Sequence, residues 1–289
     1  MNSVNTRIAK DLWDSIASHF QFKEPARYLA HYTTATAATQ ILQTGQLWAT
    51  DTATFDPRHV EGHRQLFAAE AVRLYRKTGP EPNAPFRKAL SDQFSDPVLA
   101  PRFFAACLSV DTDSPHMWRT YGDDGNGVAL IIDSQLVNRD LKVIAAPCIY
   151  APSAQLDLFA NLMERCDALS VSLPAEERAE LLPHATALAN MLLQAYKHLY
   201  LSPERECRYV YMEHDGQSYP RLDAPHPERR ALPLVGAGTT SPFVCAVSGP
   251  RRTDEIDADF RERLCSAGYS NMPVTSSTVD MASLTASED

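Results

Sequence analysis

Apolar and polar positions along the chain follow helical spacing in some segments and strand spacing in others. Near the start, apolar residues recur about every fourth position, which predicts an amphipathic helix within residues 1–24. Residues 27–33 alternate and are rich in aromatic side chains, a pattern typical of a strand. Thr34 then stands where a helix N-cap is needed, and Gly45 stands just past the expected end of that helix.

The rest of the chain predicts several strands and one long helical segment. Residues 102–109 form an almost continuous apolar run, which indicates a strand buried on both faces. Apolar residues spaced by three and four positions predict helical structure over residues 153–201. Pro174 and Pro183 are expected to divide or kink this segment. Further strands are expected at residues 47–51, 128–132, 143–150, 206–212, 231–235, 243–247 and 273–276. Further helices are expected at residues 59–77, 117–121 and 251–269.

The order of these elements predicts an α+β fold. Strands come partly in runs and partly between helices, without the strict alternation of a doubly wound parallel sheet. No linker divides the chain, so we expect a single domain over residues 1–277, with an N-terminal helix at 1–24 and a helical insertion at 153–201. Residues 278–289 are expected to form a disordered tail.

Composition narrows the class of protein. The chain has 289 residues, of which 44% are hydrophobic and 22% charged, so it can bury a large core and is neither disordered nor fibrous. Its formal net charge of −9 argues against a surface that coats nucleic acid, because phosphate binding requires basic side chains. The pairs Arg229–Arg230 and Arg251–Arg252 are the candidates for a local basic patch, or else they are solvated loop charges.

The cysteines and the N-terminal segment predict a cytoplasmic protein. Six cysteines are scattered without a C-x-x-C pair, and several lie within apolar runs, so we expect small buried thiols in a reducing compartment. The first residues lack the apolar core of a signal peptide, and no apolar run approaches the roughly 18 residues of a membrane span. We therefore expect no membrane partner.

The common cofactor and metal motifs do not identify a function. No G-x-G-x-x-G follows the first strands, and neither G-x-x-x-x-G-K-[ST] nor G-x-S-x-G occurs. The glycine-rich residues 122–127 lack the lysine of a phosphate-binding loop and are expected to form a tight turn. His59 and His63 have the spacing of zinc ligands on a helix, but Glu61 would point away and no third ligand is evident. We expect no metal site.

An acidic pair before the late strand is the most informative local feature. Glu204 and Glu206 flank an arginine, and Arg208 follows two positions later. Residues two apart in a strand face the same side, so these three side chains would form one row. Such a row can hold a cationic transition state, or it can be an exposed stripe of charges that neutralise one another.

Seven motifs occur in a fixed order over residues 27–277. They are H-Y-T-T from His31, L-W-A-T-D from Leu47, F-D-P-x-x-x-E from Phe55, A-C-L-S from Ala106, M-W-R-T-Y from Met117 followed by N-G-V-A-L, K-H-L-Y-L-S-P-E-R-E-C-R from Lys197, and S-G-P from Ser248. The series resembles the bacterial domain-of-unknown-function 2971 (DUF2971) family. Two positions depart from the family pattern, because F-N-D-P reads F-D-P here and the tryptophan before E-x-E is replaced near Tyr200.

That family in turn looks like a distant relative of ADP-ribosyltransferases. This resemblance implies a central split sheet of mixed and antiparallel strands, with NAD as the substrate. It assigns Glu206 as the catalytic carboxylate and Glu204 as the group that orients the acceptor. It places His31 at the ribose and Tyr32 or Tyr121 against nicotinamide. The other cofactor-binding residues that the resemblance implies are Thr33, Ser109, Trp118 and Arg208.

The implied chemistry is consistent with this set of residues. Cleavage of the bond between nicotinamide and ribose creates an oxocarbenium-like cation, which a fixed carboxylate stabilises. Nicotinamide leaves as a neutral molecule, so no strong general acid is required, whereas the acceptor benefits from a nearby base. The resemblance implies a toxin or phage-defence effector that modifies nucleic acid or protein, and it leaves open which acceptor is used and whether an antitoxin or immunity partner exists.

Two other functions stay open on the sequence. A catalytically inactive module of the same fold would use the pocket to bind a nucleotide or a protein, in line with the departures from the family pattern. A metal-dependent nuclease would use four acidic residues that lack a recognisable ligand spacing, namely Asp56, Glu61, Glu204 and Glu206.

Overall fold

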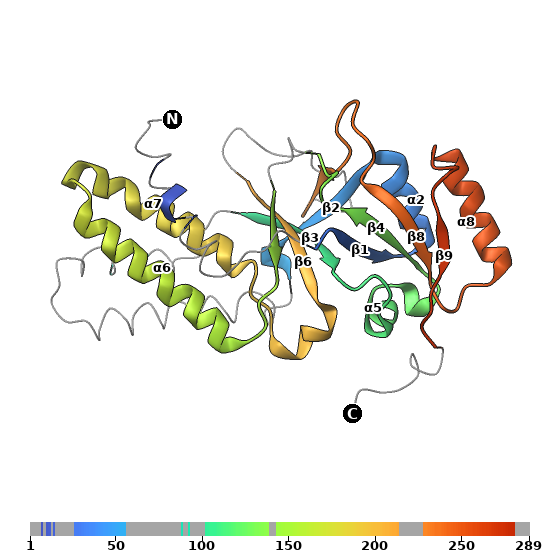
Figure 1. The fold of residues 1–289 in the computed structure, drawn as a ribbon, viewed down its shortest axis with the longest axis horizontal. Helices are drawn as coiled ribbons and strands as arrows, with labels where there is room; N and C mark the ends of the chain where they lie inside the picture. Colours follow the sequence, from blue (N-terminus) through green and yellow to red (C-terminus); the bar gives the residue numbers. More distant parts are fainter. Residues whose placement is uncertain are drawn as a thin grey trace.

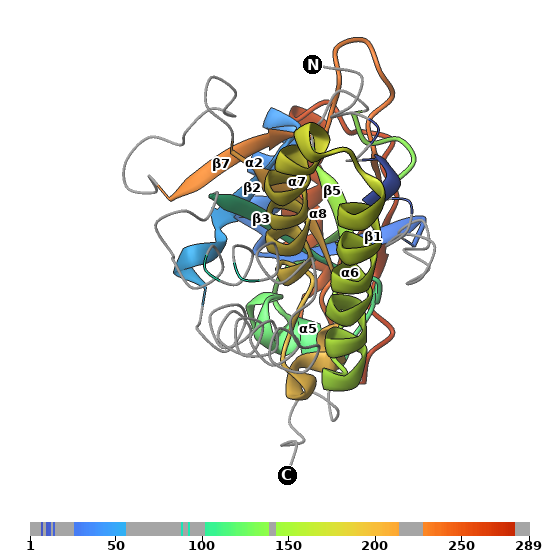
Figure 2. The ribbon, with the colours of Figure 1, turned by 90° about the vertical axis from the view of Figure 1, so that its left-hand side faces the viewer.

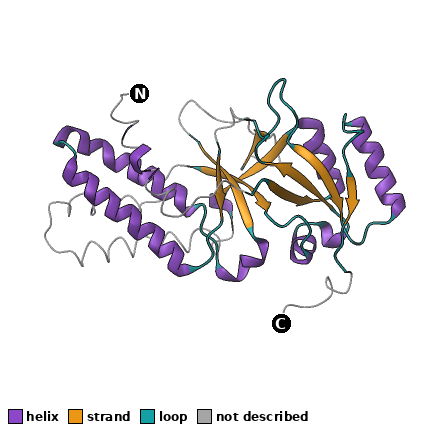
Figure 3. Ribbon diagram, in the orientation of Figure 1, coloured by secondary structure: helices purple, strands orange, loops and turns teal. Residues whose placement is uncertain are grey.

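The structure is a computed structural model that describes residues 26–55, 102–138, 143–213 and 228–280, together with residues 7, 10–12, 14, 88 and 92. These residues form a large mixed β-sheet with helices packed around it (Figure 1 and Figure 3). The α+β fold expected from the sequence is therefore confirmed.

Most expected elements appear close to their expected positions. The strands are β1 (Tyr28–Thr33), β2 (Gln46–Asp51), β3 (Phe103–Ser109), β4 (Val128–Asp133), β5 (Ile144–Pro147), β6 (Glu206–Met212), β7 (Arg229–Pro233), β8 (Phe243–Ser248) and β9 (Val274–Ser276). The α-helices are α2 (Ala35–Thr44), α5 (Pro115–Thr120), α6 (Pro152–Ser172), α7 (Ala175–Leu193) and α8 (Asp254–Ser266). The 3-10 helices of the described residues are η1 (Thr52–Thr54), η3 (Asp123–Gly125) and η4 (Leu199–Glu204).

Nine strands of the described part make up the sheet. Its main path runs β5–β6–β3–β1–β4–β8–β9, and β2 joins β3 to β7 beside this path. Every neighbouring pair is antiparallel except β8 and β9, which are parallel. The antiparallel pairs join strands that are far apart in the sequence, whereas the parallel pair β8 and β9 is joined through α8.

Strand β3 shares one of its edges between two partners. It pairs with β6 along its whole length, from Phe103 to Ser109. On its other edge, Ser109 pairs with Ala30 of β1, whereas Phe104 and Ala105 pair with β2. A strand has only two edges, so β1 and β2 must diverge from each other where they meet β3. The sheet is therefore split between β1 and β2.

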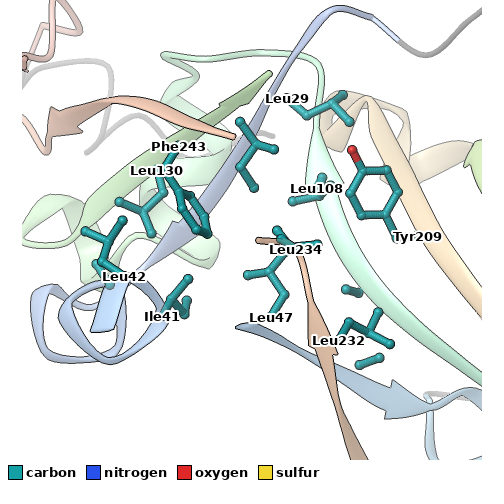
Figure 4. Close-up of a cluster of buried hydrophobic side chains, with 14 of the residues drawn as sticks. Leu29, Ile41, Leu42, Leu47, Leu108, Leu130, Tyr209, Leu232, Leu234 and Phe243 are labelled. Atoms are coloured by element: carbon teal, nitrogen blue, oxygen red, sulfur yellow. The ribbon is translucent and has the colours of Figure 1, made fainter. Parts of the chain in front are cut away.

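The main core lies on the face of the sheet that α2 and α8 cover (Figure 4). Leu29 and Leu130 of the sheet pack there with Ile41 of α2 and Phe260 of α8. Full burial of such a side chain contributes about 1.5–3 kcal/mol. The alternating residues of β1 and β4 therefore fix which side of the sheet the two helices occupy.

Helix α5 covers the opposite face beside β1. Trp118 of α5 is fully buried and packs edge-on against Tyr32, with ring centroids 4.8 Å apart. The Trp118 indole N–H donates a hydrogen bond of 2.7 Å to Asp113. Asp113 also accepts bonds from Ser277 and from the backbone and hydroxyl of Thr278. One carboxylate thus ties the C-terminal segment to the base of α5.

Helices α6 and α7 form the helical insertion that the sequence predicts. They lie side by side at one end of the molecule, away from α2 and α8 (Figure 1 and Figure 2). Pro174 separates the two helices, whereas Pro183 lies within α7 without ending it. The returning chain is fastened by Tyr196, whose hydroxyl donates to Gln155 O at 2.5 Å and which bridges Ile149.

Several predictions concern residues outside the described part. These are most of the N-terminal helix at 1–24, the helix at 59–77 and the last part of the tail, 281–289. Within the described residues, no helix combines the length and the apolar character that a membrane span requires.

The capping signals around α2 are confirmed. The Thr34 hydroxyl accepts a bond from Ala37 N at 3.2 Å, and Gly45 ends the helix in a left-handed conformation with φ of 65°. The Gly45 N–H donates to Ile41 O at 2.8 Å. A Cβ atom at Gly45 would lie 2.9 Å from Val235 Cγ2, so this glycine is needed for its conformation and for its lack of a side chain.

We expect Gly45→Ala to destabilise the protein. The left-handed conformation costs an alanine about 1–2 kcal/mol, and the contact with Val235 adds to this cost. Gly268→Ala is the matched control, because Gly268 also follows a helix and has φ of 86°, but a Cβ atom there would meet nothing within 4 Å. Chemical denaturation should show the larger loss for Gly45→Ala. Equal losses would contradict a role for the Val235 contact.

Candidate functional site

A cleft of about 780 Å³ lies at the split in the sheet. This volume falls within the range of about 300–1,000 Å³ that is typical of small-molecule sites. Its walls come from β1 and α2 on one side, from β3, α5 and the start of β6 on another, and from β2 with Arg229. Six of the residues predicted from the sequence line it, namely His31, Tyr32, Thr33, Tyr121, Glu204 and Glu206.

His31 occupies the gap where β1 leaves β3. Its ring nitrogen Nδ1 lies 3.2 Å from the carbonyl oxygen of Cys107, between the segments of β3 that pair with β1 and with β2. A carbonyl oxygen can only accept, so Nδ1 carries the proton. Burial lowers the pKa of His31, although the bond to Cys107 opposes this effect. The ring is therefore neutral at pH 7, and Nε2 carries a lone pair.

Glu206 is held at the first position of β6 by its backbone and by its side chain. Its N–H donates to the Tyr150 hydroxyl at 2.7 Å, and its carbonyl accepts from Cys148 N at 2.8 Å. Its carboxylate accepts two bonds of 3.1 Å from Arg208 and one of 2.5 Å from Lys197. The carboxylate is fixed in orientation before any ligand arrives.

Glu204 and Glu206 share Lys197. The Lys197 ammonium group binds both carboxylates, and all three side chains are buried. Together with Arg208 they form a buried ion cluster of two carboxylates and two cations, so their formal charges cancel. The cluster is not the exposed stripe that one interpretation of the sequence offered.

The predicted row of three side chains in one strand is only partly correct. Glu206 and Arg208 do face the same side of β6, where they bind each other. Glu204 ends the 3-10 helix η4 instead, and Arg205 turns the chain with a left-handed φ of 42°. The two carboxylates therefore approach each other through Lys197 and not through strand alternation.

The electrostatics of the buried ion cluster keep its groups charged. Burial alone would raise the pKa of Glu206, but Arg208 and Lys197 outweigh it and hold that pKa well below its usual range. Burial likewise opposes the charge on Lys197, yet Glu206 and Glu204 raise its pKa above the usual value. Both groups stay ionised across the neutral range.

The α6–α7 insertion positions the two cations. Gln194, just after α7, accepts a 2.7 Å bond from Arg208 through its backbone carbonyl. The Lys197 N–H donates to Ile149 O at 3.2 Å, and the Lys197 carbonyl accepts from the Gln155 side chain at 2.9 Å. The insertion therefore contributes directly to the cleft.

Tyr121 stands at the open side of the buried ion cluster. It follows α5, is 42% exposed, and its hydroxyl interacts with the Glu204 carboxylate. Partial burial and the charges of Glu204 and Glu206 raise the pKa of Tyr121. The phenol therefore stays protonated and presents an aromatic face to the cleft.

Three predicted cofactor-binding residues do not line the cleft. Ser109 is fully buried, and its hydroxyl donates to Glu204 O at 2.8 Å because Ser109 and Glu206 are cross-strand partners. Trp118 belongs to the core under α5. Arg208 is fully buried behind Glu206. These side chains support the residues of the cleft and do not face a ligand.

Four residues of the site received no role from the sequence. Lys197 begins the motif K-H-L-Y-L-S-P-E-R-E-C-R, but nothing in that motif indicated that its side chain lies between two carboxylates. Cys107 is an exposed residue within a strand expected to be buried on both faces, and its thiol lies against Glu206. Trp48 and Arg229 lie in the β2–β7 wall, where alternation along β2 was the available signal.

The arginine pairs are not a basic patch. Arg230 is fully buried and binds Glu213 at 2.8 Å, and Arg252 binds Asp257 at 2.7 Å. Arg251 binds Asp124, which lies in the glycine-rich turn. The charges of these three arginines are thus used within the fold, whereas Arg229 lines the cleft.

The expectation of small buried thiols is correct for two of the six cysteines. All six cysteines are free thiols, but only Cys166 and Cys207 are buried. Among the described residues, no three His, Cys, Asp or Glu side chains are grouped as metal ligands. His59 and His63, like the acidic residues Asp56 and Glu61, lie outside the described part.

Replacing Lys197 with methionine should destabilise the protein, because it leaves two buried carboxylates with one cation. Removal of one partner from a buried ion pair typically costs about 3–5 kcal/mol. We expect a loss of this order in the free energy of unfolding at pH 7. The loss should shrink between pH 7 and pH 5, because the unpaired carboxylate of the folded variant takes up a proton that the unfolded chain does not hold at that pH.

The wild-type protein should show no such gain on acidification. The folded-state pKa of Glu206 is lowered, so its contribution to stability is complete above the ordinary glutamate pKa of 4.5 and declines only below it. Lys197→Met combined with Glu204→Gln removes one charge of each sign and should recover most of the stability. A loss for Lys197→Met below about 1 kcal/mol, as for an exposed ion pair, would contradict the buried ion cluster.

Comparisons with known proteins give no relative for this chain. No family model, no curated protein and no solved structure matches it. The family resemblance of its motifs therefore stays a prediction, and the case for a function rests on the geometry of the cleft.

Proposed function

We propose that the cleft binds NAD and that its Glu206 end cleaves the bond between nicotinamide and ribose, so that ADP-ribose passes to an acceptor. One observation carries this proposal. The split in the sheet brings His31 of β1 and the Glu204–Glu206 pair to the walls of one cleft, although they lie far apart in the sequence. A central split sheet of mixed and antiparallel strands is also what the resemblance to ADP-ribosyltransferases implies.

Glu206 has the properties that this reaction requires of its carboxylate. Loss of nicotinamide leaves positive charge on the ribose, and a carboxylate that is already oriented stabilises that charge without reorganisation. Arg208 and Lys197 keep Glu206 ionised and fixed at the edge of the cleft. Because the cluster carries no net charge, its attraction for the cation comes from the short distance and orientation of the carboxylate oxygens.

His31 and Tyr121 supply the remaining contacts to the nicotinamide riboside. The lone pair on His31 Nε2 can accept a hydrogen bond from a ribose hydroxyl, because Nδ1 is already bound to Cys107 O. The exposed ring of Tyr121 can stack on the planar nicotinamide. Tyr32 is less suited to that role, since its ring packs against Trp118 and its hydroxyl donates to Asp111 O.

Glu204 is placed to act on the acceptor. It lines the same cleft two residues before Glu206 and shares Lys197 with it. A carboxylate beside the reacting ribose carbon can orient an acceptor hydroxyl, amide or guanidinium group and receive its proton. The proposed role is that of a cytoplasmic toxin or phage-defence effector that modifies nucleic acid or protein.

A second candidate function is a binding module without turnover. It is favoured by the full set of partners on Glu206, which includes Arg208, Lys197 and the Cys148 thiol at 3.5 Å. A carboxylate satisfied in this way gains less from a cationic ribose than an unpaired one would. A metal-dependent nuclease is less favoured, because the Lys197 ammonium group already lies between the two carboxylates.

Nicotinamide release from NAD, measured by chromatography, tests the proposal. We expect Glu206→Gln to reduce kcat by 100-fold or more, because loss of one fixed electrostatic group typically costs about 10²–10³-fold. Mass spectrometry of a lysate incubated with NAD should show ADP-ribose adducts for the wild-type protein and none for the variant. A variant that retains the wild-type rate would overturn the assignment.

Two controls separate catalysis from folding. Glu206→Gln combined with Arg208→Met leaves the Lys197–Glu204 ion pair intact, so it should recover thermal stability but not nicotinamide release. Glu213→Gln breaks the ion pair with Arg230 beyond the far end of β6, and its rate should stay within twofold of wild type. Calorimetric binding of NAD without any nicotinamide release by the wild-type protein would favour the binding module.

A further inference from the structure

The wall formed by β2 and β7 differs chemically from the buried ion cluster at the Glu206 end of the cleft. Gln46, Trp48 and Thr50 line the cleft, whereas the alternate residues Leu47 and Ala49 belong to the main core. This alternation follows from the two-residue period of a strand. Three side chains of β2 therefore face the cavity, and none of them belongs to the buried ion cluster.

Trp48 and Arg229 form a stacked pair on this wall. Trp48 is 42% exposed, and the Arg229 guanidinium carbon lies 5.2 Å from the centroid of its ring. Arg229 is positioned by strand pairing, because it lies opposite Thr50. Its Nε atom is buried and donates no hydrogen bond to any described residue, and the Glu228 carboxylate lies 3.6 Å away.

The two ends of the cleft thus offer different chemistry. At the Glu206 end, the cations are bound by carboxylates within the buried ion cluster. At the Trp48 end, a half-exposed aromatic ring lies beside the guanidinium group of Arg229, which also lines the cleft. A flat aromatic surface binds a nucleotide base by stacking, and arginine binds phosphate through paired N–H groups.

The positions of the two ends fit the two halves of a dinucleotide. β2 and β6 lie on opposite edges of β3, so their backbones are separated by two strand spacings, roughly 10 Å. In NAD, nicotinamide and adenine lie at opposite ends of the molecule, with the pyrophosphate between them. A molecule whose nicotinamide riboside contacts Glu206 can place its adenylate half against the β2–β7 wall of the same cleft.

We infer that Trp48 and Arg229 bind the adenylate half of NAD, with the adenine base packed against the Trp48–Arg229 pair and the Arg229 guanidinium bound to the adjacent phosphate. This inference rests on the proposed function and adds the orientation of the substrate to it. The subsite is remote from the bond that breaks. It therefore binds the ground state and the transition state alike, and its loss raises KM without lowering kcat.

Binding of two half-molecules tests the subsite without any turnover. Calorimetry with AMP, which carries only the adenylate half, should show affinity weakened tenfold or more in Trp48→Ala and in Arg229→Gln. The affinity for nicotinamide mononucleotide, which lacks the adenosine, should stay within twofold. In nicotinamide release from NAD, both variants should raise KM tenfold or more and leave kcat within twofold.

Tyr28→Ala is a matched control for Trp48→Ala. Tyr28 is 44% exposed and has the Arg27 guanidinium carbon 5.2 Å from its ring centroid, the same separation as in the Trp48–Arg229 pair. Tyr28 does not line the cleft. Its replacement should leave AMP affinity and KM unchanged, because it removes a similar stacked pair elsewhere on the surface.

The outcomes distinguish the subsite from the proposed function. The first outcome is that nicotinamide is released while AMP affinity and the KM for NAD are unchanged in Trp48→Ala and Arg229→Gln. This outcome would overturn the subsite and leave the proposed reaction intact. AMP binding that depends on Trp48 without any nicotinamide release would support the subsite and refute the reaction. The inference would also be overturned if the wild-type protein did not bind AMP. It would be overturned likewise if the two variants lost only the transfer of ADP-ribose to the acceptor.

Discussion

A strand has two hydrogen-bonding edges, and the way β3 uses its edges determines the rest of this structure. One edge is taken entirely by β6, so β1 and β2 must share the other. They pair with different parts of β3, and the carbonyl of Cys107, which lies between those parts, is bound by the His31 ring. The cleft is therefore a consequence of strand pairing. Its walls are strands on either side of the split and helices that pack on the sheet.

The same pairing explains why a helical insertion at one end of the molecule affects the cleft. Cross-strand pairing brings Glu206 beside Ser109, at the end of β3 where β1 also pairs. A carboxylate buried there needs cations, and one of the two comes from Lys197 at the base of the α6–α7 pair. The core of that pair is separate from the core of the sheet. Its contribution to the cleft is thus local, made through Lys197 and through the Gln194 carbonyl that binds Arg208.

Local features of the fold could be predicted from the sequence, whereas the pairing of distant side chains could not. The cap at Thr34, the left-handed Gly45 and the apolar strand at 103–109 depend on neighbours within a few residues, so the pattern reveals them. The relation of Glu206 to Arg208 follows from strand period alone. In contrast, three features depend on which strands become neighbours. They are the burial of the Ser109 side chain, the position of Lys197 between two carboxylates, and the orientation of Trp48 towards the cleft. A single sequence does not specify those neighbours.

Stability does not account for the buried ion cluster. Taking four charged groups out of water is costly, and well-packed apolar residues of similar volume are often equally stable or more stable. The chain uses apolar packing immediately beside the cluster, where Ala105, Ala146 and Val210 pack with the end of the α7 segment. Four charged groups meet where β6 borders the cleft, and there they hold the Glu206 carboxylate ionised at the cleft wall. Such an arrangement costs stability at one position in return for a fixed negative group, which a ligand carrying or developing positive charge would use.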